Sequence, residues 1–284
     1  MFLSERFFLV EFLIYIFFFI LSIGIGIVGV VGGFGGGVFL FPILILAGFP
    51  IEIAAANSLI SLFLPSVLAT IHNHRRNEIN YKLGIGFEIP TALGAIIGAN
   101  LTLLLPPTLL YVTFGLIAFI MAYMMVKDLN EKNSKIKGEK SFFKLIMGFG
   151  PKLKYGGSEK TSNTGYLMLI ISGLTSGMLA GLFGIGAGWI KAPLMITGFG
   201  VPSNIASATA TFMIVITSAV GGYTHFLHGS LDVIFFPLTL GLLVGAEIGC
   251  KIRDRIQTLV ITKVVIISLV IIGGTMIARI FFSF

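Results

Sequence analysis

Long apolar stretches follow one another along almost the whole chain, and they limit the fold more than any other feature. Hydrophobic residues make up 56% of the 284 residues and charged residues only 11%, whereas soluble domains carry about 25% charge. A water-soluble globule needs more charge than this to cover its surface, so that class is excluded, as is a disordered chain. We therefore expect an all-α protein that crosses a membrane several times.

The lengths of these stretches predict the number of crossings, because a spanning helix needs about 20 apolar residues. About eight full spans are expected, at 7–31, 51–72, 83–105, 108–126, 165–183, 202–227, 232–250 and 257–282. Two further stretches, 38–48 and 189–199, have about 11 residues each and reach roughly halfway across a bilayer. The first stretch lacks a cleavage site of small residues, so we interpret it as a retained helix.

A glycine cluster precedes each short stretch, and the two clusters reveal an internal repeat. The matching positions, always 151 residues apart, are Gly33, Gly35, Gly37 and Pro42 with Gly184, Gly186, Gly188 and Pro193. The offset is 152 between Pro50 and Pro202, and it returns to 151 between 94–98 and 245–249. This ordered series predicts two homologous membrane halves, 1–127 and 164–284, joined by the polar, Lys-rich linker 128–163.

Lys and Arg predict which side of the membrane each loop occupies, because cytoplasmic loops carry them in excess. The segment at Arg75 and the linker 128–163 are then cytoplasmic, while the turns at Pro106 and Gly229 are external. Arg75 aligns with Leu227, beside the external turn, so the two halves are expected to be inverted repeats. Each glycine cluster would break a helix, and the short helix after it would be either re-entrant or spanning.

Paired broken helices near the middle of a membrane are a design of secondary transporters. The free N–H groups and positive dipole end of each short helix would face its break, and such ends bind anions. The alternative is that the glycines only allow helices to pack closely. The candidate anion-binding residues at the breaks are Gly33, Gly35, Gly36, Gly37, Gly184, Gly186 and Gly188.

Charged side chains inside apolar stretches are further candidates, since they are costly there and usually functional. Lys191 lies three residues after Gly188 and would bind the anion, unless it snorkels to an interface. Glu88 and Glu247 are candidate proton carriers, and Glu247 could instead neutralise Lys191. The other alternative for either carboxylate is a structural hydrogen bond.

Polar side chains follow each short stretch on the next apolar segment. Asn57, Ser58 and Thr209 are the substrate-binding candidates among them, and Asn57 and Thr209 are equivalent by the repeat. The alternative is that such groups only bond the carbonyl four residues back.

Several of these motifs together resemble the sulfite exporter TauE/SafE family. They are Gly32–Pro42, Ala54–Ser58 and His72–Asn77, with a second copy of the first motif at Gly181–Pro193. The resemblance implies a multi-pass permease, like those for 4-toluene sulfonate uptake, that moves sulfite, sulfonates, sulfoacetate or related anions. The family usually has Thr-Ser where this chain has Asn57-Ser58, and again where it has Thr209-Ala210. If these positions contact the anion, the anion preference of this chain is expected to differ from that of sulfite exporters.

The sequence thus favours a secondary active transporter of small sulfur-containing anions, coupled to protons or another ion. An anion channel or facilitator without coupling is the alternative. An enzyme is not expected, because no span places a nucleophile beside a base. No cofactor or metal is expected either, since the single Cys250 cannot form a cysteine-ligated cluster.

The expected partners are the anion and the lipid bilayer of the cell membrane. The net charge of +7 does not indicate nucleic acid, because the excess Lys lies mainly in one loop. Assembly into a homo-oligomer is left open.

Overall fold

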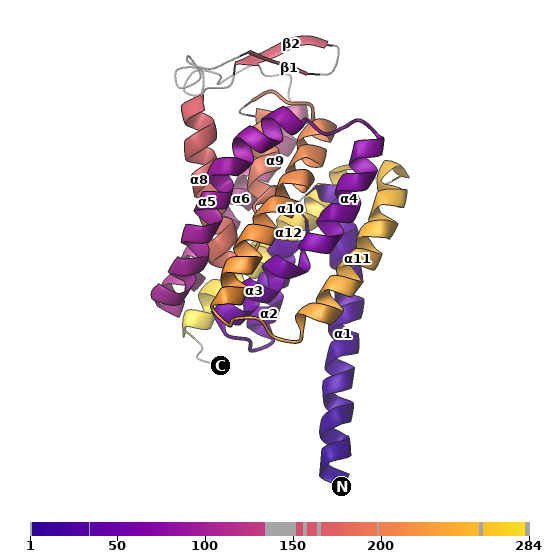
Figure 1. Ribbon diagram of the computed structural model, residues 1–284, viewed down its shortest axis with the longest axis vertical. Helices are drawn as coiled ribbons and strands as arrows, with labels where there is room; N and C mark the ends of the chain where they lie inside the picture. Colours follow the sequence, from indigo (N-terminus) through magenta and orange to yellow (C-terminus); the bar gives the residue numbers. More distant parts are fainter. Residues whose placement is uncertain are drawn as a thin grey trace.

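The computed structural model describes residues 2–33, 35–133, 152–155, 158–163, 166–197, 199–255 and 258–281. Its helices are α1 (Phe2–Gly32), α2 (Gly37–Leu46), α3 (Ile51–Ser61), α4 (Phe63–Arg75), α5 (Tyr81–Leu104), α6 (Pro107–Asn133), α8 (Tyr166–Phe183), α9 (Gly188–Thr197), α10 (Ser203–Leu227), α11 (Phe235–Ile252) and α12 (Thr258–Phe281). They form one elongated bundle (Figure 1), as expected for an all-α membrane protein.

Within the described residues, six helical segments are long and apolar enough to span a membrane, rather than the eight expected. They are Phe12–Gly32, Ile51–Arg75, Tyr81–Leu104, Pro107–Lys127, Ser203–Leu227 and Phe235–Ile252. The expected spans at 165–183 and 257–282 correspond to α8 and α12. These two helices have 18 and 24 residues, and the shorter apolar segments described within them are Leu169–Phe183 and Val265–Arg279.

The segment expected as one span at 51–72 is interrupted, because α3 ends at Ser61 and α4 begins at Phe63. Pro65 explains the break: it has no N–H to donate to the carbonyl of Ser61, and its ring crowds that carbonyl. The matching segment of the second half, α10, is one continuous helix of 25 residues.

The two short helices, α2 and α9, have 10 residues each; α2 packs against α1 and α3, and α9 packs against α10. Phe49, just after α2, packs with its ring centroid 6.2 Å from that of Phe18 on α1. Phe199, just after α9, belongs to the same buried cluster as Leu169 near the start of α8. Figure 1 shows α2 and α9 pointing to opposite ends of the bundle.

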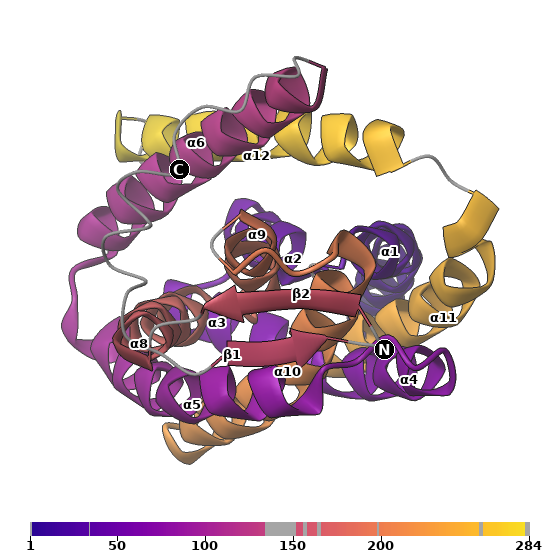
Figure 2. The same ribbon diagram turned by 90° about the horizontal axis from the view of Figure 1, so that it is seen from above.

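Helices from the two parts of the chain pack in a reciprocal pattern. The helix α1 packs along α11, α8 packs along α5, and α6 pairs with α12, with the last pair forming an arc beside the other helices (Figure 2). Glycines make the first two contacts very close. A Cβ at Gly26 of α1 would lie 3.1 Å from the Cα of Gly245 on α11, and one at Gly94 of α5 would lie 3.1 Å from the Cα of Gly177 on α8.

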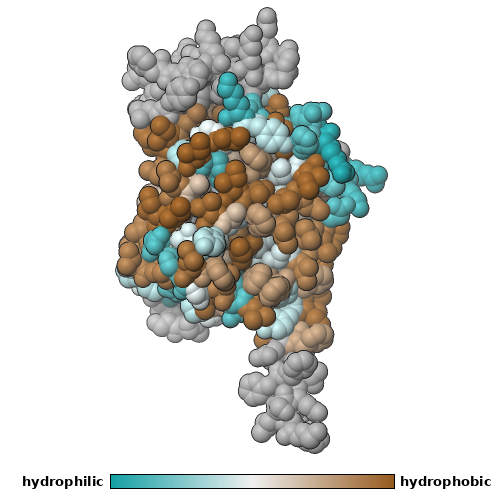
Figure 3. All heavy atoms as spheres, in the orientation of Figure 1, coloured by the Kyte–Doolittle hydropathy of each residue, from teal (hydrophilic) through white to brown (hydrophobic). Residues whose placement is uncertain are grey.

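The outer surface of the bundle is largely apolar. Large hydrophobic side chains are exposed on most helices, with Leu104 at 77%, and Figure 3 shows hydrophobic atoms over most of the face in view. Such a surface is unfavourable in water and suits contact with lipid chains. The multi-pass membrane class expected from the sequence is therefore confirmed.

A small antiparallel hairpin lies beyond one end of the bundle (Figure 1), within the segment expected to be a linker. Its strands are β1 (Lys152–Tyr155) and β2 (Ser158–Asn163), with Lys152 opposite Asn163. This hairpin was not expected, since the sequence analysis assigned only polar linker to these residues.

Candidate functional site

Two glycine turns interrupt the helical ladder in the interior, one between α1 and α2 and the other between α8 and α9. Gly35 has φ +77° and Gly186 has φ +69°, a backbone region that side chains with a Cβ rarely adopt. There is also no room for a side chain. A Cβ at Gly35 would lie 2.7 Å from Cδ1 of Ile214, and a Cβ at Gly186 would lie 2.9 Å from Cδ1 of Leu62.

The two turns meet each other inside the molecule. A Cβ at Gly37 would lie 3.0 Å from the Cα of Ile185. The buried Ser58 hydroxyl links the turns, since it donates to the Gly184 carbonyl at 2.9 Å and lies 3.4 Å from the Gly37 carbonyl. The structure therefore brings the two glycine clusters and Ser58 together, although they are far apart in the sequence.

The short helices leave backbone donors at these turns. Within the described part of the chain, the amides of Gly36, Gly37, Gly186 and Gly188 donate to no carbonyl. The first amides of any helix lack internal partners and carry the positive end of its dipole. The meeting point of α2 and α9 thus has the properties of an anion site.

Lys191 forms an ion pair inside the bundle. Its Nζ lies 2.6 Å from Oε2 of Glu88 and 2.9 Å from the hydroxyl of Thr217. That hydroxyl also bonds the other carboxylate oxygen of Glu88. The Lys191 and Glu88 side chains are 0% and 2% exposed, so the ion pair is buried. The pair joins α9 to α5, and the Thr217 hydroxyl connects both to α10.

The partner of Lys191 is therefore Glu88 and not Glu247. Glu247 lies near the end of α11 with its side chain 37% exposed, 3.2 Å from the His72 imidazole and 2.9 Å from Lys251 Nζ. The sequence could not separate the two glutamates, because both stand in apolar stretches and only the packing of distant helices decides which one meets Lys191.

Asn57 and Thr209 are buried, but neither bonds a glycine turn, and the Asn57 side-chain amide donates to the Ile53 carbonyl four residues back at 2.7 Å. The Asn57 side-chain oxygen accepts from the Asp232 amide at 3.1 Å. The Thr209 hydroxyl accepts from the Asn80 amide at 3.0 Å. These contacts hold the segments that lead into α11 and α5.

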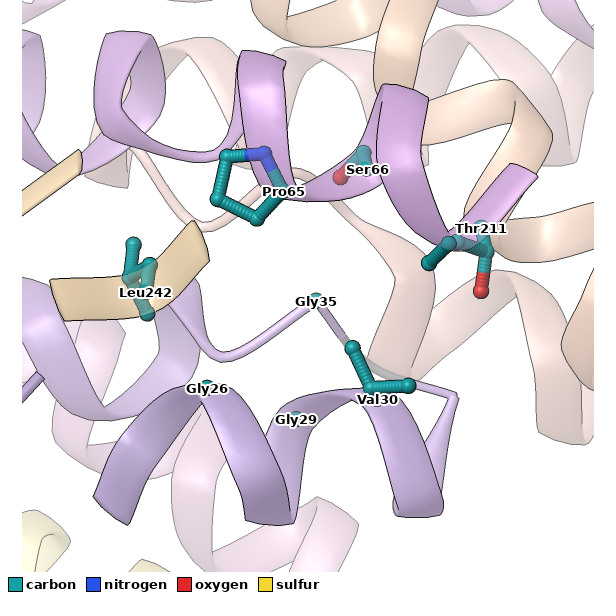
Figure 4. Close-up of a pocket in the computed structure, with 9 residues that line it drawn as sticks. Gly26, Gly29, Val30, Gly35, Pro65, Ser66, Thr211 and Leu242 are labelled. Carbon is teal, nitrogen blue, oxygen red and sulfur yellow. The ribbon is translucent and has the colours of Figure 1, made fainter. Parts of the chain in front are cut away.

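A narrow pocket opens beside the first glycine turn (Figure 4). It has room of the order of one water molecule. Its walls come from four helices and the turn itself: Gly26, Gly29, Val30, Gly35, Pro65, Ser66, Ala69, Thr211 and Leu242. Sequence reasoning did not single out Ser66. The sequence clue that could have identified it is its position directly after Pro65, which cannot donate a helical hydrogen bond.

Charged side chains join α4 and α11 beyond this pocket. His72 stands one helical turn after the pocket residue Ala69 and pairs with Glu247. Arg253, which follows α11, lies 3.2 Å from the Glu78 carboxylate and donates to Asn73 at 2.9 Å. The two helix ends are therefore tied together at the same end of the pocket walls.

Comparison with known proteins decides the family. The family model described as sulfite exporter TauE/SafE matches residues 18–276. The chain belongs to this family. The family resemblance found in the glycine motifs is thereby confirmed over most of the chain.

Similar proteins are known from bacteria and plants. The "Probable membrane transporter protein YunE" of Bacillus subtilis is 26% identical over 275 residues, covering 93% of this chain and 97% of that protein. A second one from Bacillus subtilis, YdhB, is 28% identical over 87% of this chain and 93% of its own length. The Arabidopsis thaliana "Sulfite exporter TauE/SafE family protein 6" is 31% identical over 29% of this chain and 21% of its own length. No solved structure matches the chain.

These findings place the chain among membrane transporters rather than enzymes. The expectations of transport and of no enzymatic activity are confirmed at this level.

Proposed function

We propose that the protein is a secondary active transporter of small sulfur-containing anions such as sulfite, sulfonates or sulfoacetate. The observation that carries the proposal is the meeting of two broken helices, each with free amides at its start, beside a buried Lys–Glu pair. Amides at helix starts suit anions, and buried charges within membrane segments are typical of ion pathways. The sulfite exporter names in the family support the substrate class.

The arrangement of the two halves supports the proposal of inverted repeats, 1–127 and 164–284. Gly33 lies against Ser207, while its equivalent Gly184 lies against Ala55, the equivalent of Ser207. The Asn57–Asp232 and Thr209–Asn80 bonds are related in the same way. Reciprocal contacts of this kind are what a two-fold relation between the halves produces.

The proposed topology follows from this symmetry and from the basic loops. The hairpins α1–α2 and α8–α9 are re-entrant from opposite sides of the cell membrane. The linker 128–163 and the end of α4 lie in the cytoplasm.

We assign ion coupling to Glu88. When it is ionised, it holds the Lys191 ammonium group. When it takes up a proton, the attraction is lost, and Lys191 becomes free to bind an anion beside the glycine turns. Proton and anion would then occupy the site together, which is the requirement for coupled transport. Glu247 is the second candidate proton carrier, at the partly exposed end of α11.

Uptake of labelled sulfite, thiosulfate and sulfonates into proteoliposomes tests this function. We expect at least one of these anions to accumulate when a pH gradient is imposed, and little accumulation without it. Equal movement with and without the gradient would instead indicate an uncoupled channel or facilitator. Absence of movement for every sulfur anion would overturn the proposed substrate class.

A further inference from the structure

The first glycine turn borders a pocket, and one polar group that lines this pocket has no partner in the described part of the chain. At the second turn the indole Nε1 of Trp189 is likewise buried without a partner. Ser66 lines this pocket across from Gly35 and Val30 (Figure 4). The residue is only 2% exposed. Within the described part of the chain its hydroxyl makes no hydrogen bond, although the Ser66 amide donates to the Leu62 carbonyl at 3.0 Å.

Other hydroxyls on the neighbouring helix behave differently. Ser218, the repeat equivalent of Ser66, is fully buried and bonds the Ile214 carbonyl at 2.6 Å. Thr211, which also lines the pocket, bonds the Ser207 carbonyl at 2.9 Å. The Ser66 hydroxyl instead opens onto the pocket, where it is available to donate a hydrogen bond to an occupant.

Backbone donors lie next to the same space. Gly29 lines the pocket, and a Cβ at this position would lie 2.6 Å from the Gly36 nitrogen. The absent side chain at Gly29 lets the Gly36 nitrogen, at the start of α2, lie close to the pocket wall. No charged side chain lines the pocket, so the donors that line it are neutral.

We propose that this pocket is a neutral oxyanion subsite, in which the Ser66 hydroxyl and the amides at the start of α2 bind the oxygens of the transported anion. The inference rests on the proposed transport of sulfur anions and adds Ser66 as a substrate-binding residue. The equivalent serine on α10, Ser218, is satisfied within its own helix and takes no part in this subsite.

The pocket in this conformation is too narrow for an oxyanion, so binding requires α4 to move away from α1 and α11. This movement would turn the Ser66 hydroxyl toward an anion without breaking any bond that the hydroxyl now makes.

The test compares purified wild-type protein with Ser66→Ala and Ser218→Ala, using labelled sulfite in equilibrium binding and uptake in proteoliposomes. We expect Ser66→Ala to weaken sulfite binding roughly 10- to 100-fold, the effect of losing a hydrogen bond to a charged group. Ser218→Ala should bind as the wild type does. Without anion, Ser66→Ala should unfold at the wild-type temperature, since its hydroxyl supports no protein contact.

A second pair of variants tests the amides. Gly29→Ala places a methyl group against the Gly36 nitrogen, whereas Gly24→Ala on the same helix meets nothing within 4 Å. We expect weakened binding only in Gly29→Ala. Wild-type affinity in both Ser66→Ala and Gly29→Ala, with sulfite still bound by the wild type, would overturn the subsite and leave the transport proposal intact. Absence of binding by the wild type to sulfite, thiosulfate and sulfonates would overturn both.

Discussion

A lysine and a glutamate buried together are costly to take from water, and each depends on the other once it is inside. The contact of Lys191 and Glu88 therefore constrains substitutions more than any surface charge of the molecule. Thr217 adds a third polar group from α10, so the pair also joins helices of both halves. Substitutions of Glu88 and Lys191, singly and together, therefore distinguish a loss of stability from a loss of ion coupling.

Glu88→Gln should leave the Lys191 ammonium group without its counter-charge. We expect the free energy of unfolding to fall by about 3–5 kcal/mol, measured by thermal unfolding in detergent. The double variant Glu88→Gln with Lys191→Gln should regain most of that stability. If Glu88 carries the coupling proton, the double variant remains unable to use a pH gradient.

Glu247→Gln is the matched control for the unfolding measurement, because its carboxylate is partly exposed and its pairs are worth little; we expect it to unfold close to the wild-type temperature. A double variant that recovers gradient-driven uptake would show that the pair only balances charge.

At the scale of elements, the helix breaks were predictable and their surroundings were not. Glycine clusters determine local backbone freedom, so the ends of α1 and α8 followed from nearby residues. The choice of Glu88 over Glu247 depends on helices that meet only in the folded chain. The break between α3 and α4 had a local signal in Pro65, but the apolar residues around it continue as if the helix were straight.

The pocket serine escaped prediction for another reason. A serine in an apolar helix usually bonds its own backbone, so its sequence gives no sign that Ser66 does not. Only its position beside the turn, and the absence of a hydrogen bond from its hydroxyl to the Leu62 carbonyl, reveal the difference.

The two glycine turns should tolerate no added carbon. Gly35→Ala combines a positive φ with a Cβ 2.7 Å from Ile214, whereas Gly48→Ala, after α2, has a positive φ and open space. Both variants bear the backbone cost of about 1 kcal/mol. We expect only Gly35→Ala to lose transport as well, measured by uptake at equal amounts of inserted protein. Wild-type transport by Gly35→Ala would mean that the turn only serves helix packing.

At the scale of the whole molecule, the reciprocal pairing of α1 with α11 and α5 with α8 is the property that the repeat predicts. The equivalent glycines are among the residues at which these helices touch, but the sequence offset alone did not indicate which helices would pair. The hairpin of β1 and β2 lies outside the repeated parts, and no sequence periodicity indicated it.

Cysteine accessibility tests the topology that follows. In a background of Cys250→Ala, cysteines at Arg75 and in the linker should react only with reagents that enter the cytoplasm. Cysteines at Pro106 and Gly229 should react from outside if the two halves are inverted as proposed. Labelling of the Arg75 and Gly229 positions from one side would contradict the inverted arrangement.

The interruption at Leu62 makes the two halves mechanically unequal. In the second half, α10 is a single rod of 25 residues. Its counterpart consists of two helices, α3 and α4, that meet at Leu62. The second of them, α4, contributes Pro65, Ser66 and Ala69 to the pocket wall. We expect α4 to turn about this joint more easily than α10 can bend, so that a motion of α4 would reshape the pocket wall while α10 stays in place.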